Sequence, residues 1–282
     1  MTMDVLRPRT LAEALEMKAR RPDARPIAGG TDLMVEINFG HLRPPAMMDV
    51  SRLPELGVIR RDDGEVFVGA GVTYTRMIRE LDELGPLRQA ARSVGSPQIR
   101  HRGTLGGNLG TASPAGDTLP VLAAYDAQVE VASAARGSRS MAWNEFLVGP
   151  KRTALEPDEL ILGASWRVPR GTGSFSKVGT RNAMVIAVVG LCLVLDTERQ
   201  QVRVALGSVG PTILRAPQAE QLANDALRRG SHIDAADLDA FGAQVAEAAR
   251  PIDDVRGTAA YRKHACAVLG RRALAWALEE KC

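Results

Sequence analysis

Two glycine-rich stretches decide how this chain is interpreted, Ala28-Gly29-Gly30-Thr31-Asp32-Leu33 and Thr104-Leu105-Gly106-Gly107-Asn108-Leu109-Gly110. In the first, residues 25–28 are predicted to form a short strand, the glycine pair permits a tight backbone turn, and the Thr-Asp pair is expected to cap a helix. In the second, hydroxyl and amide side chains flank the glycine pair. Backbone N–H groups in such turns suit anions. The two stretches therefore predict two walls of one phosphate site, and a dinucleotide as its ligand.

Neither stretch is a common nucleotide-binding motif. The chain has no GxGxxG, so the Rossmann fingerprint is missing, and no Gly-Lys-Ser/Thr, so there is no P-loop. A single glycine pair is most simply a tight turn. Two pairs with matching polar flanks, followed by Ser113-Pro114-Ala115-Gly116-Asp117, favour a binding site instead.

The composition is that of an ordinary globular protein. With 282 residues the chain has room for roughly two domains with ample core. Apolar residues make up 45% and charged residues 24%. A net charge of +3 is too small to argue for nucleic acid, and 4% aromatic residues leave few platforms for stacking bases.

Metal sites and membrane segments are not expected. The cysteines are widely spaced without a CxxC pair and are predicted to be reduced thiols in the cytoplasm: Cys192, Cys266 and Cys282. None of the four histidines has metal-ligand spacing. Residues 1–10 lack the apolar core of a secretory signal, and the longest apolar run, 183–195, is too short to span a bilayer.

The order of predicted elements indicates an α+β domain followed by a domain of strands and then helices. The first is expected to span 1–170, with subdomains at about 1–55 and 56–170, and the second 174–282 after a linker at 170–173. In the first domain we expect helices at 10–21 and 75–91, the latter broken at 85–86, and strands at 46–50, 57–60, 66–69, within 125–139 and at 160–168. In the second we expect strands at 175–179, 184–195 and 202–207 and helices at 216–229, 235–249 and 258–279.

These motifs make the chain similar to a known family. It resembles the FAD-binding medium subunit of the molybdenum hydroxylases, the family of xanthine, nicotinate, aldehyde and CO dehydrogenases. The resemblance covers nearly the whole chain and rests on five motifs, which are the first glycine stretch, the run 98–108, and the segments 113–117, 177–181, and 254–257 with Tyr261-Arg262. It implies an FAD-binding PCMH-type fold, which is VAO-like and has two subdomains, followed by a C-terminal domain of a three-stranded sheet plus helices.

The resemblance also implies which residues of the two loops contact the cofactor. The first loop would wrap the FAD pyrophosphate through backbone amides, with its last residue against the flavin ring; its residues are Pro26, Ile27, Ala28, Gly29, Gly30, Thr31, Asp32 and Leu33. In the second loop, Thr104 and Asn108 match positions that hydrogen-bond phosphate or ribose oxygens. Gly106 and Gly107 lie between them.

Two charged residues are assigned by the same resemblance. Asp117 matches an acid that holds a hydroxyl-bearing part of the cofactor, and the alternative is a cap for a helix at 119–124. Lys177 would lie beside the isoalloxazine, where a cation would favour the negatively charged reduced flavin and raise its potential. Without the resemblance, a solvated lysine on a strand face is the simpler interpretation.

Weaker correspondences complete the expected site and indicate a branch of the family. Ile161 corresponds to an apolar flavin contact, Val94 to an adenine-side contact, and Arg181 to a position near the ring. His101 stands where many relatives carry asparagine. The chain lacks the cysteine-bearing insertion of 4-hydroxybenzoyl-CoA reductase. It also lacks the Gly-Gly-His-Ser and Gly-Gly-Asp typical of CO dehydrogenase, which favours the purine, nicotinate or aldehyde branch.

The function implied is that of an FAD-binding electron-transfer subunit. Electrons would arrive from [2Fe–2S] clusters of a small partner and leave through FAD to NAD, a quinone, oxygen or another acceptor, while a large partner carries molybdopterin in a heterotrimer that doubles. No catalytic residue is expected in this chain, because the flavin carries the chemistry. Two alternatives stay open: a self-contained FAD oxidoreductase of VAO-like fold, for which no flavin-linking His or Cys is apparent, and a flavin-free scaffold subunit, against which the intact loops argue.

Overall fold

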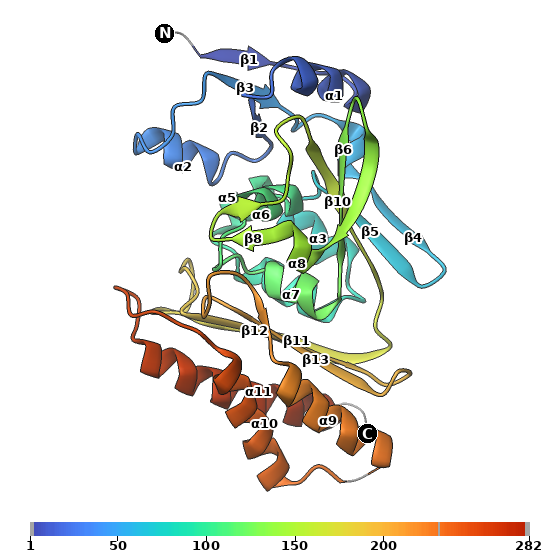
Figure 1. Ribbon diagram of the computed structural model, residues 1–282, viewed down its shortest axis with the longest axis vertical. Helices are drawn as coiled ribbons and strands as arrows, with labels where there is room; N and C mark the ends of the chain where they lie inside the picture. Colours follow the sequence, from blue (N-terminus) through green and yellow to red (C-terminus); the bar gives the residue numbers. More distant parts are fainter. Residues whose placement is uncertain (1–2, 231, 280–282) are drawn as a thin grey trace. The chain divides into compact units, whose positions relative to one another are not determined.

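The computed structural model describes residues 3–230 and 232–279, and the chain divides into two compact units (Figure 1). Unit 1 consists of Met1–Arg76, Pro97–Ala112 and Ala127–Arg167. Unit 2 consists of Met77–Ser96, Ser113–Asp126 and Val168–Cys282. Each unit thus combines segments that lie far apart in the sequence.

Unit 1 begins with a three-stranded parallel sheet. Its central strand, β3 (Ala46–Asp49), pairs with β1 (Asp4–Leu6) on one side and with β2 (Arg25–Ile27) on the other. Helix α1 (Leu11–Arg20) connects β1 to β2 and begins at Thr10, whose hydroxyl accepts a hydrogen bond from a first-turn amide. The first glycine stretch begins where β2 ends.

The second sheet of unit 1 is antiparallel, in the order β4-β5-β10-β6-β7. Its strands are β4 (Ile59–Asp62), β5 (Glu65–Gly69), β6 (Gln128–Ser133), β7 (Gly137–Ala142) and β10 (Leu160–Arg167). Strands β4 and β5, predicted at 57–60 and 66–69, pair with each other as a hairpin. Strands β8 (Leu147–Gly149) and β9 (Arg152–Thr153) form a separate small ribbon.

The short helices of unit 1 include one that sequence analysis did not predict because its composition disfavours helix. Helix α6 (Leu105–Thr111) contains three glycines, each of which costs about 1 kcal/mol relative to alanine. It forms because Thr104 caps it and because Leu105 and Leu109 are buried. The other helical segments here are α2 (Leu33–Asn38), η1 (Pro54–Gly57), α5 (Pro97–Arg102) and α8 (Trp143–Phe146).

Unit 2 contains an antiparallel sheet in the order β11-β12-β13-β14. Its strands are β11 (Gly171–Val178), β12 (Val189–Asp196), β13 (Gln201–Gly207) and the two-residue β14 (Leu214–Arg215). Every residue of β12 is buried. The predicted strand at 184–195 therefore begins late, because the preceding residues form a loop in which Met184 has a φ of 54° and its side chain is exposed.

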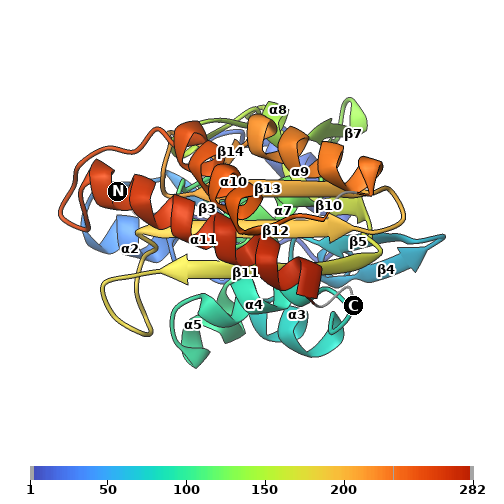
Figure 2. The ribbon, with the colours of Figure 1, turned by 90° about the horizontal axis from the view of Figure 1, so that it is seen from below.

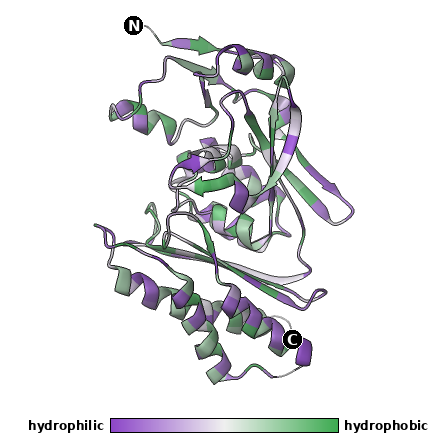
Figure 3. Ribbon diagram, viewed as in Figure 1, coloured by the Kyte–Doolittle hydropathy of each residue, from purple (hydrophilic) through white to green (hydrophobic). Residues whose placement is uncertain are grey.

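Helices cover both faces of this sheet. Helices α9 (Pro217–Arg229), α10 (Ala235–Ala248) and α11 (Ala259–Glu279) lie on one face, and Figure 2 shows α11 running across the strands. Hydrophilic and hydrophobic residues alternate along these three helices (Figure 3), as their amphipathic patterns predict.

The segments 77–96 and 113–126 add two helices to unit 2, both packed against the sheet. Helix α4 (Gly85–Ser93) packs on β11, and α7 (Leu119–Ala124) packs on β12 and β13. Helix α3 (Tyr74–Glu80) ends before the break that was predicted at 85–86. Among the helices within 3–230 and 232–279, none is long and apolar enough to cross a membrane.

A buried arginine accounts for the motif near the end of the chain. Arg262, 3% exposed, donates hydrogen bonds to the carbonyl oxygens of Val188 at 2.8 Å and Ser208 at 2.7 Å, and to Asp254 Oδ1 at 2.7 Å. The turn 254–257 is thereby tied to the ends of two strands. We infer a structural role for this motif, since both Nη groups of the buried guanidinium are hydrogen-bonded within the protein.

Candidate cofactor site

The first glycine stretch forms a loop with unused backbone donors. Gly30 has a φ of 73°, which favours glycine. Within the part of the chain that the structure describes, the N–H groups of Gly29, Gly30 and Thr31 donate to no protein acceptor. They are half-buried. Three adjacent unpaired amides suit an anion such as a pyrophosphate.

The cap expected at the start of α2 is wrong in one respect. Asp32 occupies the N-cap position, but its side chain makes no capping hydrogen bond. Its Oδ2 instead accepts a hydrogen bond from Thr111 Oγ1 at 3.0 Å. Tertiary pairing therefore takes the carboxylate away from the helix end, and this bond joins the first loop to the end of α6.

The two glycine stretches lie in contact. A Cβ atom built on Gly29 would lie 1.9 Å from the carbonyl oxygen of Arg102 and 3.0 Å from the nitrogen of Gly103. Only glycine allows this approach of two backbones. The conformational freedom of Gly30 and the small volume of Gly29 thus have separate physical reasons.

The second stretch contributes less backbone to a ligand than the sequence suggested. The amide of Gly106 donates to the carbonyl of Ala70 at 2.8 Å, and the amide of Gly107 donates to Thr104 Oγ1 at 3.0 Å. A Cβ on Gly106 would lie 2.6 Å from the Cβ of Ala70, so this glycine is needed for packing. A Cβ on Gly107 would meet only Thr104 Oγ1, at 3.3 Å, and would otherwise point into open space.

An apolar neighbour of the second stretch comes from β10. A Cβ on Gly110 would lie 3.5 Å from Cδ1 of Ile161, so this side chain lies beside α6. Ile161 and Ala28 both pack against the same buried cluster of unit 1. Unit 1 holds the following predicted contacts: Pro26, Ile27, Ala28, Gly29, Gly30, Thr31, Asp32, Leu33, Thr104, Gly106, Gly107, Asn108 and Ile161.

The remaining predicted contacts, Val94, Asp117 and Lys177, lie in unit 2, where the two charged residues form a buried ion pair. Lys177 Nζ lies 2.6 Å from Asp117 Oδ2, and the two side chains are 11% and 5% exposed. Both alternative interpretations are wrong. The N-cap position of α7 is Thr118 rather than Asp117, and Lys177 is not solvated.

Burial and charge act in opposite directions on the carboxyl group of Asp117. Burial raises its pKa, and the Lys177 ammonium together with hydrogen bonds from Lys177 and Ser93 lowers it; the net shift is upward. Oδ1 of Asp117 is buried and has no partner among the residues described. An unpaired buried acceptor costs about 1–3 kcal/mol, and a hydroxyl donor of a bound molecule would remove that cost.

Ser93, the last residue of α4, is a member of this cluster that sequence analysis missed. Its Oγ lies 2.9 Å from Asp117 Oδ2, and its carbonyl accepts from Lys177 Nζ at 3.2 Å. The neighbouring Val94 is the C-cap of the same helix. A serine at a helix end is common, so the sequence offered no signal that it approaches an acid 24 positions away.

Arg181 is engaged within its own loop. Its Nε donates to the carbonyl oxygen of Met184 at 3.1 Å, and its Nη2 contacts the same oxygen. This arrangement holds the loop between β11 and β12, and it adds no support for the expected position near the flavin ring.

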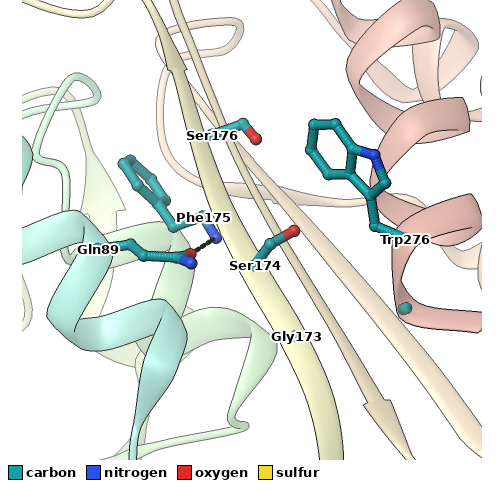
Figure 4. A pocket seen from close by; sticks show the side chains of 7 residues that line it. Gln89, Gly173, Ser174, Phe175, Ser176 and Trp276 are labelled. Atoms are coloured by element: carbon teal, nitrogen blue, oxygen red, sulfur yellow. Dashed lines mark hydrogen bonds between the residues drawn. The ribbon is translucent and has the colours of Figure 1, made fainter. Parts of the chain in front are cut away.

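A separate small pocket lies beside β11 (Figure 4) and shares no residue with the predicted contacts. Ser174, Ser176 and Trp276 lie on the side of the strand that faces α11, whereas Phe175 lies on the other side with Gln89. The Gln89 Oε1 accepts from the amide of Phe175 at 2.7 Å. Neither Lys177 nor Asp117 lines this pocket, so it is distinct from the ion pair.

Metal chemistry has no candidate ligand set in the described ranges. Among residues 3–230 and 232–279, no group of three or more His, Cys, Asp or Glu side chains could hold a metal ion. Cys192 and Cys266 are buried free thiols. The third cysteine, Cys282, lies outside the described residues.

Comparison with known proteins identifies the family. A family model described as "FAD binding domain in molybdopterin dehydrogenase" matches residues 1–170, and one described as "CO dehydrogenase flavoprotein C-terminal domain" matches residues 174–277. The chain therefore belongs to the family of FAD-binding subunits of the molybdenum hydroxylases. The free amides of the first loop, in unit 1, suit the pyrophosphate of such a cofactor. Separately, the unpaired Asp117 oxygen, in unit 2, suits a hydroxyl donor.

Individual relatives agree along almost the full length. The xanthine dehydrogenase FAD-binding subunit of Escherichia coli is 29% identical over 280 residues, covering 95% of this chain and 94% of the relative. The nicotine 6-hydroxylase medium subunit of Paenarthrobacter nicotinovorans is 30% identical over 278 residues, with coverages of 95% and 94%. The CO dehydrogenase structure from Hydrogenophaga pseudoflava matches with a TM-score of 0.91 at 25% identity and covers 100% of this chain and 99% of that one.

Proposed function

We propose that this chain is the electron-transfer subunit of a heteromeric molybdenum hydroxylase. It would bind FAD, accept electrons from [2Fe–2S] clusters of a small partner subunit, and pass them to NAD, a quinone, oxygen or another acceptor. A large partner would carry molybdopterin and the substrate pocket. The bound flavin would supply the two-electron redox chemistry, and this chain would supply binding, orientation and electrostatics.

The observation that carries the proposal is the unpaired set of amides at Gly29, Gly30 and Thr31. They lie where the first loop packs against the backbone at Arg102 and Gly103. Such a loop can bind a pyrophosphate with neutral backbone dipoles and without a lysine or arginine. The unpaired Oδ1 of Asp117 supports a second contact, to a hydroxyl group, because a carboxylate would repel phosphate.

Several narrower statements belong to this proposal. The predicted contacts in the two glycine-rich loops, together with Val94, Ile161 and Lys177, would line the cofactor. The chain would work in the cytoplasm, within a doubled heterotrimer. The buried free thiols of Cys192 and Cys266 fit the reducing conditions of that compartment. The loop sequences favour a purine, nicotinate or aldehyde hydroxylase, and the names of the relatives leave that choice among substrates open.

The test is to purify the chain with its native partners, record the visible spectrum, and identify released nucleotide and copurifying chains by mass spectrometry. FAD together with iron–sulfur and molybdopterin subunits would support the proposal. FAD on a lone chain that oxidises small molecules would support the self-contained oxidoreductase instead. A preparation without flavin would support the scaffold.

A substitution at Gly107 tests the cofactor's position. We expect Gly107→Val to abolish flavin retention, because side-chain bulk would enter the open space next to this glycine. Gly85→Val is the matched control, since a Cβ there meets nothing within 4 Å and Gly85 lies outside the predicted site. Full flavin content in the folded Gly107→Val protein would remove the second stretch from the proposed site.

A further inference from the structure

Two groups from separate segments of unit 2 converge on one oxygen of Asp117. Lys177 of β11 lies 2.6 Å from Oδ2, and the hydroxyl of Ser93 at the end of α4 lies 2.9 Å from the same atom. Lys177 Nζ also donates to the carbonyl of Ser93 at 3.2 Å. Asp117, Lys177 and Ser93 thus form a closed triangle, in which Ser93 contacts Asp117 through its hydroxyl and Lys177 through its backbone carbonyl.

The other oxygen of Asp117 is left out of this triangle. Oδ1 is buried and receives no hydrogen bond from any residue within the described ranges. Lys177 Nζ donates a charge-assisted hydrogen bond to Oδ2, whereas the single hydroxyl proton of Ser93 is shared between Oδ2 and the carbonyl oxygen of Ala90, 2.7 Å from its Oγ. Rotation of the carboxyl group would break the bond from Lys177 and the contact with Ser93. The triangle therefore fixes the direction in which Oδ1 points.

The charges within the triangle compensate each other. Lys177 and Asp117 lie in contact with 11% and 5% of their side chains exposed, so water screens this pair weakly. Seen from a few ångströms away, the pair is a dipole rather than a single positive charge. This differs from the expectation that Lys177 acts on a flavin as a lone cation.

We propose that Lys177 and Ser93 are positioning residues that act through Asp117: they hold Oδ2 so that Oδ1 accepts a hydrogen bond from a hydroxyl group of the cofactor, and Lys177 and Asp117 affect the flavin as a neutral pair. The proposal rests on the proposed function, because it requires that FAD binds this chain. Ser93 thereby takes part in cofactor binding. The positive charge of Lys177 is compensated by Asp117 and does not act on the flavin alone.

The first experiment measures the reduction potential of bound FAD by dye-equilibrated titration of the assembled complex. Four proteins are compared: wild type, Lys177→Met, Asp117→Asn and the double variant. A neutral pair predicts a lower potential in Lys177→Met, a higher potential in Asp117→Asn, and a return to the wild-type value in the double variant. A lone cation predicts that Asp117→Asn changes nothing and that the double variant matches Lys177→Met.

The second experiment measures the dissociation constant of FAD for the full-length chain by fluorescence titration. We expect Asp117→Asn and Ser93→Ala to weaken binding, the first by about tenfold or more because a hydrogen bond to a charged acceptor is lost. In the Asp117→Asn background, Ser93→Ala and Lys177→Met should each change the constant by less than about twofold, as residues acting through one partner are not additive. Ser138→Ala, on the exposed strand β7, is the control.

The outcomes separate the two proposals. A wild-type chain and complex that bind no FAD would overturn the proposed function and this inference together. FAD binding that Asp117→Asn weakens, with fully additive effects of Ser93→Ala and Lys177→Met, would overturn the positioning role alone. Thermal unfolding without FAD shows whether each variant is folded. If a charge variant is not, the affinity test still rests on Ser93→Ala, which is the mildest change.

Discussion

The substitution Gly29→Ala tests the contact between the two glycine stretches. The new Cβ would lie 1.9 Å from the carbonyl oxygen of Arg102 and 2.5 Å from its carbonyl carbon. Both atoms belong to the backbone, so no side chain can rotate to relieve the clash. One segment must therefore move by more than about 1 Å, well beyond the play of a packed interior.

The expected cost follows from this geometry. Overpacking typically costs about 1–3 kcal/mol, and we expect the upper end, about 3 kcal/mol, because the clash is between two backbones. Replacing glycine also stabilises by about 0.4–1 kcal/mol through the unfolded chain, which is too little to compensate. For a protein of this size, such a loss lowers Tm by on the order of 10 °C.

The assay is thermal unfolding of the purified full-length chain, together with its flavin content. Gly29→Ala should lower both Tm and flavin retention, since the displaced loop carries the unpaired amides. Gly57→Ala is the control, because its Cβ would meet only an Arg76 side-chain nitrogen at 3.7 Å, an ordinary contact. A Gly29→Ala protein with wild-type Tm and full flavin would refute both the close approach and its role in the site.

Three further predictions concern buried groups. Arg262→Met should cost about 3 kcal/mol or more in urea unfolding, since it removes the donor to the carbonyl oxygens of Val188 and Ser208 and breaks the ion pair with Asp254; a loss under about 1 kcal/mol would contradict the structural role of this arginine. The hydrogen-bonded Arg139 holds the pKa of Glu159 below its usual range. The ionised Glu159 therefore stabilises the fold at pH values above its unfolded pKa of about 4.3. This contribution is lost as the pH falls through the lower pKa of the folded state. Glu159→Gln should thus cost about 1 kcal/mol at neutral pH and nothing in strong acid, which urea unfolding across pH can show, and a pH-independent difference would count against the ion pair. Burial raises the pKa of Cys266 to about 12, so we expect iodoacetamide to label it only after unfolding, and rapid labelling of the native protein, read by peptide mass spectrometry, would be the contrary result.

Local sequence patterns predicted most elements of unit 2. The helices at 217–229, 235–248 and 259–279 lie within a residue of their predicted ranges, because amphipathic periodicity is a local property. The loop before β12 was predicted as strand because it is apolar, yet Met184 and Ile186 are exposed. Helix α6 was missed for the opposite reason, since glycine disfavours helix and burial of its leucines overrides that preference.

The candidate site shows the same division. The sequence alone indicated a phosphate-binding pair of glycine stretches and named Asp117 and Lys177, partly through family resemblance. It could not show that Gly106 packs on Ala70 while the amides of the first loop stay unpaired. Those properties depend on which backbones meet after folding.

What the sequence determined by itself is the class of chain: the glycine stretches, the order of strands and helices, and a composition without metal-ligand clusters are all local or additive properties. Only the tertiary structure decided the electrostatics. Lys177 and Asp117 are 60 positions apart, and Ser93 is a further 24 positions from the acid. Whether such residues become a buried neutral pair or two solvated charges depends on how three segments of unit 2 pack, because a charge loses its water only when the rest of the fold covers it.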